Sequence, residues 1–244
     1  MRIPFVLRSI ALLTSVLALL AVPAHAGTIT WQNSAGGSFN SSANWSPAQV
    51  PGPGDTAVIN LAGTYSVSID ADTHVSAIQL GGSSGTQTLT LSGHMLTVDS
   101  SFTVGTNGVF NMASGTLAGT FTVTTTGAGQ FNWLNGTITG TLSIPAGSAM
   151  NFGNGGNGQT ISGGTINNAG TIDILTGART ISLNNGAAIN NSGTLDNEST
   201  GGNSGGISID STSAFHMTGG TLSGGQRLVF EGSNSSAINW DAGT

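Results

Sequence analysis

A short phrase that returns along the chain limits what this sequence can fold into. It is Gly-Thr followed by an aliphatic residue, and its copies are Gly115-Thr116-Leu117, Gly136-Thr137-Ile138, Gly164-Thr165-Ile166, Gly170-Thr171-Ile172, Gly193-Thr194-Leu195 and Gly220-Thr221-Leu222. The first two copies belong to longer segments that match at one constant spacing, that of Phe110 and Phe131. Self-similarity at roughly 20–50 residues is typical of repeat folds, in which each unit buries its apolar face by stacking on the next.

Short alternating segments lie between and within these phrases. Aliphatic residues alternate with Thr or Ser, which gives a strand one apolar and one polar face, and clusters of Gly, Asn or Ser separate the segments. The expected strands include 56–59, 65–69, 88–91, 95–98, 102–104, 141–144, 171–174, 180–183, 207–209 and 228–230. Helix signals are almost absent after residue 26, because the glycines, of which the chain has 39, interrupt any long helical window.

The constant spacing of the first two copies favours a solenoid over a sandwich or a barrel. We predict an all-β fold, a right-handed parallel β-helix whose coils lie about 4.8 Å apart, the normal distance between paired strands. The expected stacks are Phe110, Phe131 and then Met150 or Phe152 inside the helix, and Asn111, Asn132 and Asn151 at a turn. The uneven spacings of the later phrases are interpreted as loop insertions between coils, and residues 27–244 should make roughly nine or ten coils.

Residues 1–26 have the pattern of a secretory signal peptide. Arg2 and Arg8 precede an apolar stretch over 10–22, and Ala24-His25-Ala26 is a small-x-small cleavage site. The apolar stretch of about 13 residues is too short to span a bilayer, which needs about 20. We therefore expect an exported protein, secreted or at the cell surface, with no transmembrane segment in the mature chain.

The composition excludes several classes of function. After residue 26, Arg179 and Arg227 are the only strong cations, against ten acidic residues. Such a chain lacks the clustered Lys and Arg that phosphate contacts require, so that neither nucleic acid nor anionic lipid is an expected partner. The chain has no cysteine, which excludes disulfides and thiolate metal ligands.

The start of the mature chain differs from the repeats that follow. Residues 27–60 contain Trp31, Phe39 and Trp45, and we expect them to form an N-terminal cap and entry strands that protect the edge of the first coil. The alternative use of Trp31 and Trp45 is an aromatic platform for sugars. Residues 61–244 should be β-helix coils, truncated at the C-terminal end.

A set of motifs lies between residues 31 and 104. They are Trp31, Gly37-x-Phe39, Asn44-Trp45-Ser46, Val50-Pro51-Gly52-Pro53-Gly54-Asp55-Thr56-Ala57-Val58-Ile59, Val67-Ser68-Ile69-Asp70 and Ile78-x-Leu80-Gly81-Gly82. Together they resemble the opening of large secreted bacterial β-helix proteins of the autotransporter passenger-like and adhesin-like type. The resemblance implies a β-helix displayed at the outer membrane or released outside the cell. Such proteins usually carry a C-terminal sorting signal or anchor, which is not recognisable here, so we expect a fragment or a short secreted form.

Asp173 and Asp196 are the sharpest candidates for chemistry. Both follow the Gly-Thr-aliphatic phrase at the same position, so stacked coils would bring their carboxylates together. Such a pair could act as the acid and the nucleophile of a retaining glycosidase, or chelate Ca²⁺. With Arg179 beside it, the pair would suit a lyase of acidic polysaccharides. A polar turn position explains the pair as well, since the equivalent positions of the other copies hold Ala118, Thr139, Asn167 and Ser223.

The remaining polar residues have simpler explanations. Asp70 and Asp72 are expected to turn the chain after a strand. The histidines have no metal-ligand spacing, so no metal site is predicted at His74, His94 or His216. One Thr-x-Thr-x-Thr run is formed by Thr122, Thr124 and Thr126, whereas an ice- or crystal-binding face would need such a run in every coil.

These observations predict an exported surface or extracellular β-helix protein with an adhesive or structural role. Its regular Thr, Ser and Asn faces suit contact with a glycan or a cell surface. The alternatives are a polysaccharide-active lyase or hydrolase on the same scaffold and, second, an ice- or crystal-binding face. No catalytic residue, cofactor or metal is predicted, and end coils could support self-association.

Overall fold

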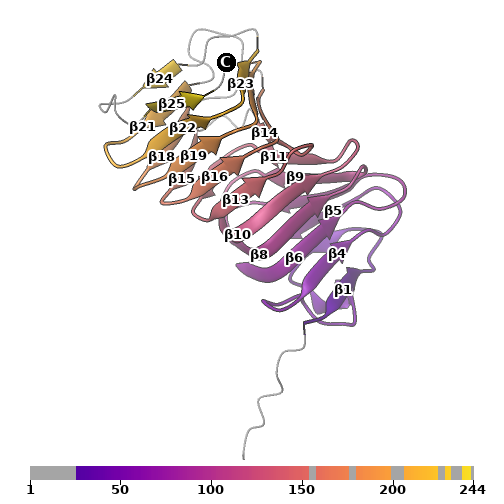
Figure 1. Ribbon diagram of the computed structural model, residues 1–244. Helices are drawn as coiled ribbons and strands as arrows, with labels where there is room; N and C mark the ends of the chain where they lie inside the picture. The colour runs from indigo at the N-terminus through magenta and orange to yellow at the C-terminus, as the bar shows by residue number, and fades with distance from the viewer. Residues whose placement is uncertain are drawn as a thin grey trace, which may run out of the picture.

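The computed structural model describes residues 26–153, 158–175, 180–198, 206–224, 229–231 and 238–242 of the 244-residue chain. Within these ranges the protein is nearly all β, with one 3-10 helix, η1 (Ser42–Asn44). The strands wind into a parallel β-solenoid of about seven turns, elongated from its N-terminal coils to its C-terminal coils (Figure 1). The predicted all-β solenoid is therefore confirmed. The signal-peptide pattern and Arg179 lie outside the described residues.

One sheet, called sheet B, is a single ladder of parallel strands. Its nine strands, in order, are β2 (Gly37–Ser38), β5 (Tyr65–Ile69), β7 (Gln87–Leu91), β9 (Gly108–Met112), β11 (Gln130–Trp133), β14 (Ala149–Phe152), β17 (Thr171–Ile174), β20 (Thr194–Asn197) and β23 (Thr221–Ser223). From β5 onward the step between coils is shortest from Asn132 to Asn151 and longest from Leu195 to Leu222. The expected nine or ten coils exceed the about seven turns of the solenoid, because that expectation divided all of residues 27–244 into coils, whereas the chain before β5 mainly closes the N-terminal end and part of the C-terminal chain lies outside the described ranges.

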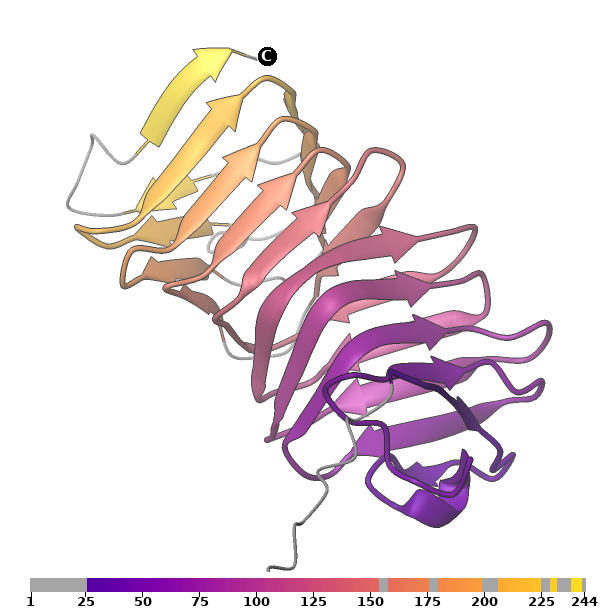
Figure 2. The same cartoon turned by 60° about the horizontal axis from the view of Figure 1, so that its bottom comes forward.

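The other sheet, sheet A, has 16 strands and changes character along the solenoid. Its N-terminal strands are β1 (Thr28–Trp31), β3 (Trp45–Ser46), β4 (Thr56–Ile59), β6 (Thr73–Leu80), β8 (Met95–Val104) and β10 (Thr116–Thr125). Beyond β10 each long strand is replaced by two short ones, so the sheet continues as two separate ladders (Figure 2).

The two ladders both begin on β10. The first ladder contains β12 (Gly136–Ile138), β15 (Gln159–Ser162), β18 (Ile181–Asn184), β21 (Gly206–Ile209) and β24 (Val229–Glu231). The second ladder contains β13 (Thr141–Ile144), β16 (Thr165–Asn168), β19 (Ala188–Asn191), β22 (Ala214–Thr218) and β25 (Ile238–Ala242). A C-terminal coil therefore has three short strands and three outer faces.

A column of glycines forms the corner between the two ladders. Gly119 bends β10 with a φ of 99°. A Cβ at Gly119 would lie 1.9 Å from the carbonyl oxygen of Val98, and a Cβ at Gly140 would lie 2.0 Å from the carbonyl oxygen of Gly119. Successive backbones approach so closely here that only glycine fits, and the positive φ of Gly119 is also one that glycine adopts readily.

The Gly-Thr phrases occupy more than one ladder, which corrects the interpretation of their spacing. The first two copies pair in sheet A and the last three pair in sheet B. The second and third copies, which are separated by a long interval, lie in different ladders. Thr137 lies in the first ladder, whereas Thr165 lies in the second ladder and pairs with Thr141 of the preceding coil. This interval is not a loop insertion. The copy that follows closely after Thr165 is the same coil passing from β16 to β17.

The interior is one continuous apolar cluster. Phe110 lies over Phe131 as predicted, with ring centroids 4.7 Å apart. The predicted asparagine stack is also present, but it lies within the strands of sheet B and not at a turn. Asn132 Nδ2 donates to Asn111 Oδ1 at 2.9 Å, and Asn151 Nδ2 donates to Asn132 Oδ1 at 2.8 Å.

The N-terminal end is closed by an antiparallel pair, β1 with β3, and by packed aromatic rings. Trp31 and Trp45 are 1% and 0% exposed, and their rings meet edge to face at 5.0 Å. Trp45 Nε1 donates to the carbonyl oxygen of Phe39 at 2.7 Å. The expectation that both tryptophans are buried is confirmed. The alternative of an aromatic platform for sugars is wrong, because both indoles are enclosed.

Candidate functional site

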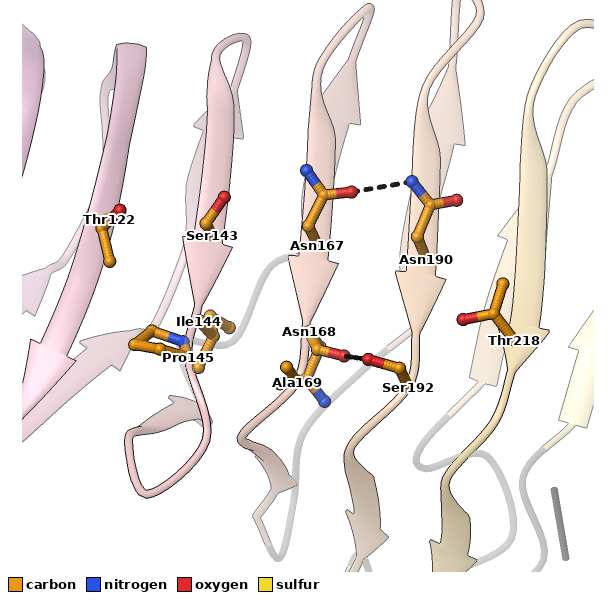
Figure 3. Close-up of a pocket in the computed structure, with 10 residues that line it drawn as sticks. All are labelled: Thr122, Ser143, Ile144, Pro145, Asn167, Asn168, Ala169, Asn190, Ser192 and Thr218. Atoms are coloured by element: carbon orange, nitrogen blue, oxygen red, sulfur yellow. Dashed lines mark hydrogen bonds between the residues drawn. The ribbon is translucent and has the colours of Figure 1, made fainter.

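A groove runs across the outer face of the second ladder. It begins on β10 and crosses β13, β16, β19 and β22, so that five successive coils contribute to it (Figure 3). Its volume is about 410 Å³. The lining residues are Thr122, Ser143, Ile144, Pro145, Asn167, Asn168, Ala169, Asn190, Ser192 and Thr218. We call this feature the axial groove, because strands are crossed in the direction of the solenoid axis.

One side of the axial groove is a row of polar side chains, one from each of the first four coils. The row is made by successive register partners, Thr122, Ser143, Asn167 and Asn190. Their neighbours on the same strands, such as Leu142 and Ile166, face the interior, because side chains alternate along a strand. We call this row the rung column.

A side-chain hydrogen bond holds the two asparagines of the rung column in line. Asn190 Nδ2 donates to Asn167 Oδ1 at 2.8 Å, and Figure 3 shows the two amides side by side. This bond uses one N–H of Asn190 and one lone pair of Asn167. The Asn167 amino group and the Asn190 carbonyl are then free to hydrogen-bond a molecule in the groove.

The other side of the axial groove is formed where the strands end. Its residues are Pro145, Ala169, Ser192 and Thr218, which we call the shoulder. Proline has no backbone N–H, so Pro145 cannot extend the ladder of β13 and the chain turns away there. The Ser192 hydroxyl donates to the carbonyl oxygen of Asn168 at 3.1 Å, which fixes the shoulder to the strand of the preceding coil.

Buried amides support the shoulder from beneath. Asn168 and Asn191 are 1% and 0% exposed, and Asn168 Nδ2 donates to Asn191 Oδ1 at 2.6 Å. Asn168 also accepts from the backbone N–H of Gly170 at 3.1 Å and donates to the carbonyl oxygen of Thr194 at 3.0 Å. Such a satisfied polar network in the interior fixes the turn from the second ladder into sheet B.

The axial groove is uncharged. None of its lining residues is acidic or basic, and the described part of the chain contains no Lys or Arg at all. The rung column continues beyond the groove to His216, whose Nδ1 lies 3.0 Å from Asn239 Nδ2. The chemistry that the groove presents to a ligand is therefore that of amides, hydroxyls and small apolar groups.

The two acidic candidates are neighbours, as predicted, but they lie on sheet B. Asp173 pairs with Asp196, next to Asn151 on one side and Ser223 on the other. Burial, then the negative charges of Asp196 and Glu198, raise the pKa of Asp173. The Ser223 hydroxyl donates to Asp196 Oδ1 at 3.0 Å. The pair thus continues the asparagine stack of sheet B and does not contribute to the axial groove.

The other predicted polar residues have structural partners. Asp70 Oδ1 accepts from the Ser38 hydroxyl at 2.7 Å, and Asp72 Oδ1 accepts from the backbone N–H of Met95 at 2.9 Å. Both aspartates lie in the connection between β5 and β6, where a turn was expected.

The histidines form pairs and no larger cluster. His74 Nε2 lies 2.7 Å from Asp99 Oδ2, and His94 Nδ1 lies 3.8 Å from Asp72 Oδ1, with the side chains exposed to solvent. Within the described ranges, no three His, Asp or Glu side chains form a group that could hold a metal ion.

The Thr-x-Thr run is part of a mixed face. Thr122 and Thr124 lie beside Ser101 and Thr103 of the preceding coil, so one neighbouring strand repeats the hydroxyl pattern. In the coil before that, Ala77 and Gln79 occupy the two positions. A regular plane of threonines, which a lattice-binding surface would need, is therefore not present on this face.

The sequence reasoning missed the axial groove, although a signal for it was present. The segments Ile166-Asn167-Asn168-Ala169-Gly170-Thr171 and Ile189-Asn190-Asn191-Ser192-Gly193-Thr194 match position by position, with Ala169 and Ser192 as the one difference. Alternation places the first Asn of each pair outside and the second inside. The doubled asparagines therefore mark both the rung column and its buried support.

The comparison with known protein families, with curated proteins and with solved structures gives no match. Among the described residues, no helix has the length and apolar character needed to cross a membrane.

Proposed function

We propose that this chain is an exported surface or extracellular β-solenoid with an adhesive or structural role, and that it contacts glycans through the axial groove. The observation that carries the proposal is the in-register rung column facing the shoulder across a concave surface. Concave sites with a few converging polar groups on an apolar background are the usual form of a ligand site. Sugars combine hydroxyl edges with apolar C–H faces, which matches this combination of amides, hydroxyls, Pro145 and Ala169.

The proposal is tested by measuring binding of the purified chain to a panel of immobilised glycans. The double variant Asn167→Ala, Asn190→Ala should lose binding, because both amides of the rung column are removed. The matched control is Asn132→Ala, Asn151→Ala, which removes a hydrogen-bonded asparagine pair of the same kind from sheet B. Equal loss of binding in both double variants, or binding that neither changes, would refute a role for the groove.

The export part of the proposal depends on the pattern in residues 1–26. It is tested by the intact mass of the native product isolated from the culture medium or the cell surface. We expect a mass that corresponds to cleavage after Ala26. A product that retains residues 1–26 and stays inside the cell would contradict export.

A polysaccharide-active enzyme is the second candidate, favoured by the pairing of Asp173 with Asp196 and by the raised pKa of Asp173. Retaining glycosidases use two neighbouring carboxyl groups, one as general acid and one as nucleophile. Incubation with the same glycan panel should then release reducing ends, and Asp173→Asn should abolish the release without changing adhesion. No release by the unmodified chain would exclude this candidate.

A further inference from the structure

We infer that the axial groove takes an uncharged, extended glycan chain that lies along the solenoid axis. This inference deepens the proposed function and rests on it. It concerns the class of ligand and its direction, neither of which follows from adhesion alone.

The direction follows from the placement of the lining residues. The first four of the five coils each supply one residue of the rung column, and those residues are register partners across strands. From β10 to β22 the groove crosses five strands, which corresponds to about 19 Å at the usual inter-strand distance. An extended β-linked glycan repeats at close to one strand spacing, so successive sugar units would meet successive rungs. A ligand lying along a strand would meet only one rung and then the shoulder.

An uncharged ligand is inferred because the groove itself carries no charge. An anionic glycan is normally bound through Arg or Lys, which form charge-assisted hydrogen bonds to carboxylate or sulfate. The described residues hold no such side chain, and the acidic residues give the whole chain a formal net charge of −6. A negative ligand would be repelled by this net charge, and none of the described residues offers a Lys or Arg to compensate.

The two sides of the groove suit different parts of a sugar, one its hydroxyl groups and the other its apolar ring face. The free amino group of Asn167, the carbonyl of Asn190 and the Ser143 hydroxyl can exchange hydrogen bonds with ring hydroxyls, either directly or through water. At the β13 end, Pro145 and Ala169 offer an apolar surface for the face of one sugar ring, above the buried Ile144. The buried pair of Asn168 and Asn191 holds these groups in place before the ligand arrives, which lowers the entropic cost of binding.

The experiment uses the full chain and two series of oligosaccharides of increasing length. One series is neutral, β-1,4-linked oligomers of glucose, N-acetylglucosamine or mannose, and the other is anionic, oligogalacturonate of matched lengths. Isothermal titration calorimetry should show affinity for a neutral series rising with length up to about four units, the span of five strands, and then levelling off. Added salt should have little effect on this binding, because no charges meet.

A single variant and an isosteric control test the site. Asn167→Asp keeps the oxygen that accepts from Asn190 but removes an amino group and adds a charge. It should weaken the neutral glycan by about fivefold to tenfold, the effect of one lost hydrogen bond. Asn111→Asp is the matched control, because its oxygen accepts from Asn132 in the same way on sheet B, and it should leave affinity unchanged.

The alternative outcomes separate the two proposals. Anionic oligomers that bind as well as neutral ones, with Asn167→Asp affecting them, would overturn the inference and leave the proposed glycan contact standing. A single sugar that binds as tightly as a long chain would overturn the axial direction. If none of the oligosaccharides binds, or if only a protein or peptide binds, both the inference and the proposed function fail.

Discussion

The coils before and after β10 use different contacts to stay stacked. In the N-terminal coils, β6, β8 and β10 are eight to ten residues long and pair along most of their length. In the C-terminal coils, β13, β16 and β19 have four residues each. Aromatic rings fill much of the interior around β8 to β11, whereas aliphatic residues and buried asparagine amides fill the interior from β15 to β20.

This difference explains where the groove lies. A long strand such as β10 presents a continuous face, so Thr124 follows Thr122 on the same surface. In the next coil Pro145 takes the position that follows Ser143 on that face and ends the strand, because it has no N–H for the ladder. Shorter strands thus turn a flat face into a concave one. In these coils, side-chain amides also link successive strands, Asn167 to Asn190 and Asn168 to Asn191.

The largest effect is expected at the N-terminal end. Trp45→Ala should destabilise the first coils by about 3–5 kcal/mol, because a fully buried ring packed on Trp31 and Phe39 is removed. Hydrogen exchange followed by mass spectrometry should show loss of protection in β1 to β6. Repeat proteins can unfold locally, so a local readout is the appropriate one.

Met95→Ala is the control for this variant, since Met95 is a large apolar side chain that is 42% exposed. It should change protection little. If Trp45→Ala left the exchange of the first coils unchanged, the aromatic packing would not be what secures this end.

The next effect is expected at the corner that divides the two regions. Gly119→Ala should cost more than about 2 kcal/mol, because its φ of 99° disfavours a side chain and its Cβ would meet the carbonyl oxygen of Val98. Gly147→Ala is the matched control, with a φ of 83° and no atom within 4 Å of the added Cβ. The control should cost about 1–2 kcal/mol. Urea denaturation measures the loss of stability in both variants. Equal losses would mean that the backbones at the corner can move apart to accept a side chain without further loss of stability.

A smaller effect is expected from the buried amides of the C-terminal coils. Asn191→Ala should destabilise by about 1–3 kcal/mol, because Asn168 Nδ2 loses its acceptor in the interior. Asn132→Ala, which breaks the partly exposed ladder of sheet B, should cost only about 1 kcal/mol, since water can replace the lost partner. Chemical denaturation measures both variants. A larger loss of stability for Asn132→Ala than for Asn191→Ala would show that the exposed asparagine stack of sheet B contributes more than the buried amides.

The smallest effect is a gain. Asp173→Asn should stabilise the protein at neutral pH by about 0.5–1.5 kcal/mol, because an amide can continue the ladder from Asn151 where a carboxylate cannot donate. The folded-state pKa of Asp173 is raised, so its charged form opposes folding above that pKa, and this penalty disappears as the pH falls towards the unfolded value. The advantage of the variant should therefore shrink between neutral and acidic pH.

Asp210→Asn provides a control of the opposite sign. Hydrogen bonds from the Asn185 backbone, Ser213 and the Thr212 backbone lower the pKa of Asp210, so its charged form favours folding above its unfolded pKa. This variant should be less stable than the parent at neutral pH, and the deficit should fade in acid. Parallel pH profiles for both variants, from urea denaturation, would contradict the assignment of the Asp173 shift.

Local patterns in the sequence were enough to predict the strands and the stacking. The strands 56–59, 65–69, 141–144 and 171–174 have the predicted bounds. In the last three, apolar residues alternate with polar ones throughout, so the local pattern alone defines the strand. The two strands predicted at 95–98 and 102–104 are a single strand, β8, because tertiary pairing with β10 carries the backbone through the polar residues between them.

The candidate site was harder to predict, because it depends on which residues become neighbours across coils. The pairing of Asp173 with Asp196 followed from a repeated phrase within one ladder and is confirmed. The axial groove combines residues of five coils with steps of unequal length, so no single spacing reveals it. The match between the segments around Asn167 and Asn190 was the one usable signal. The Gly-Thr phrases do not reveal it, because they belong to different ladders.

Because the coils are in register, the length of the solenoid changes in fixed steps of one strand spacing. Thr165 lies directly over Ala188, and Asn167 over Asn190, so the chain from one position to its partner is a closed unit whose two ends are equivalent. Duplicating such a unit would shift everything beyond it by one strand spacing, about 4.8 Å, without altering any side chain already in place. If the axial groove binds an extended glycan as proposed, the length of glycan that it accommodates is set by the number of coils, and duplication or deletion of a coil in the gene would change that length in whole steps.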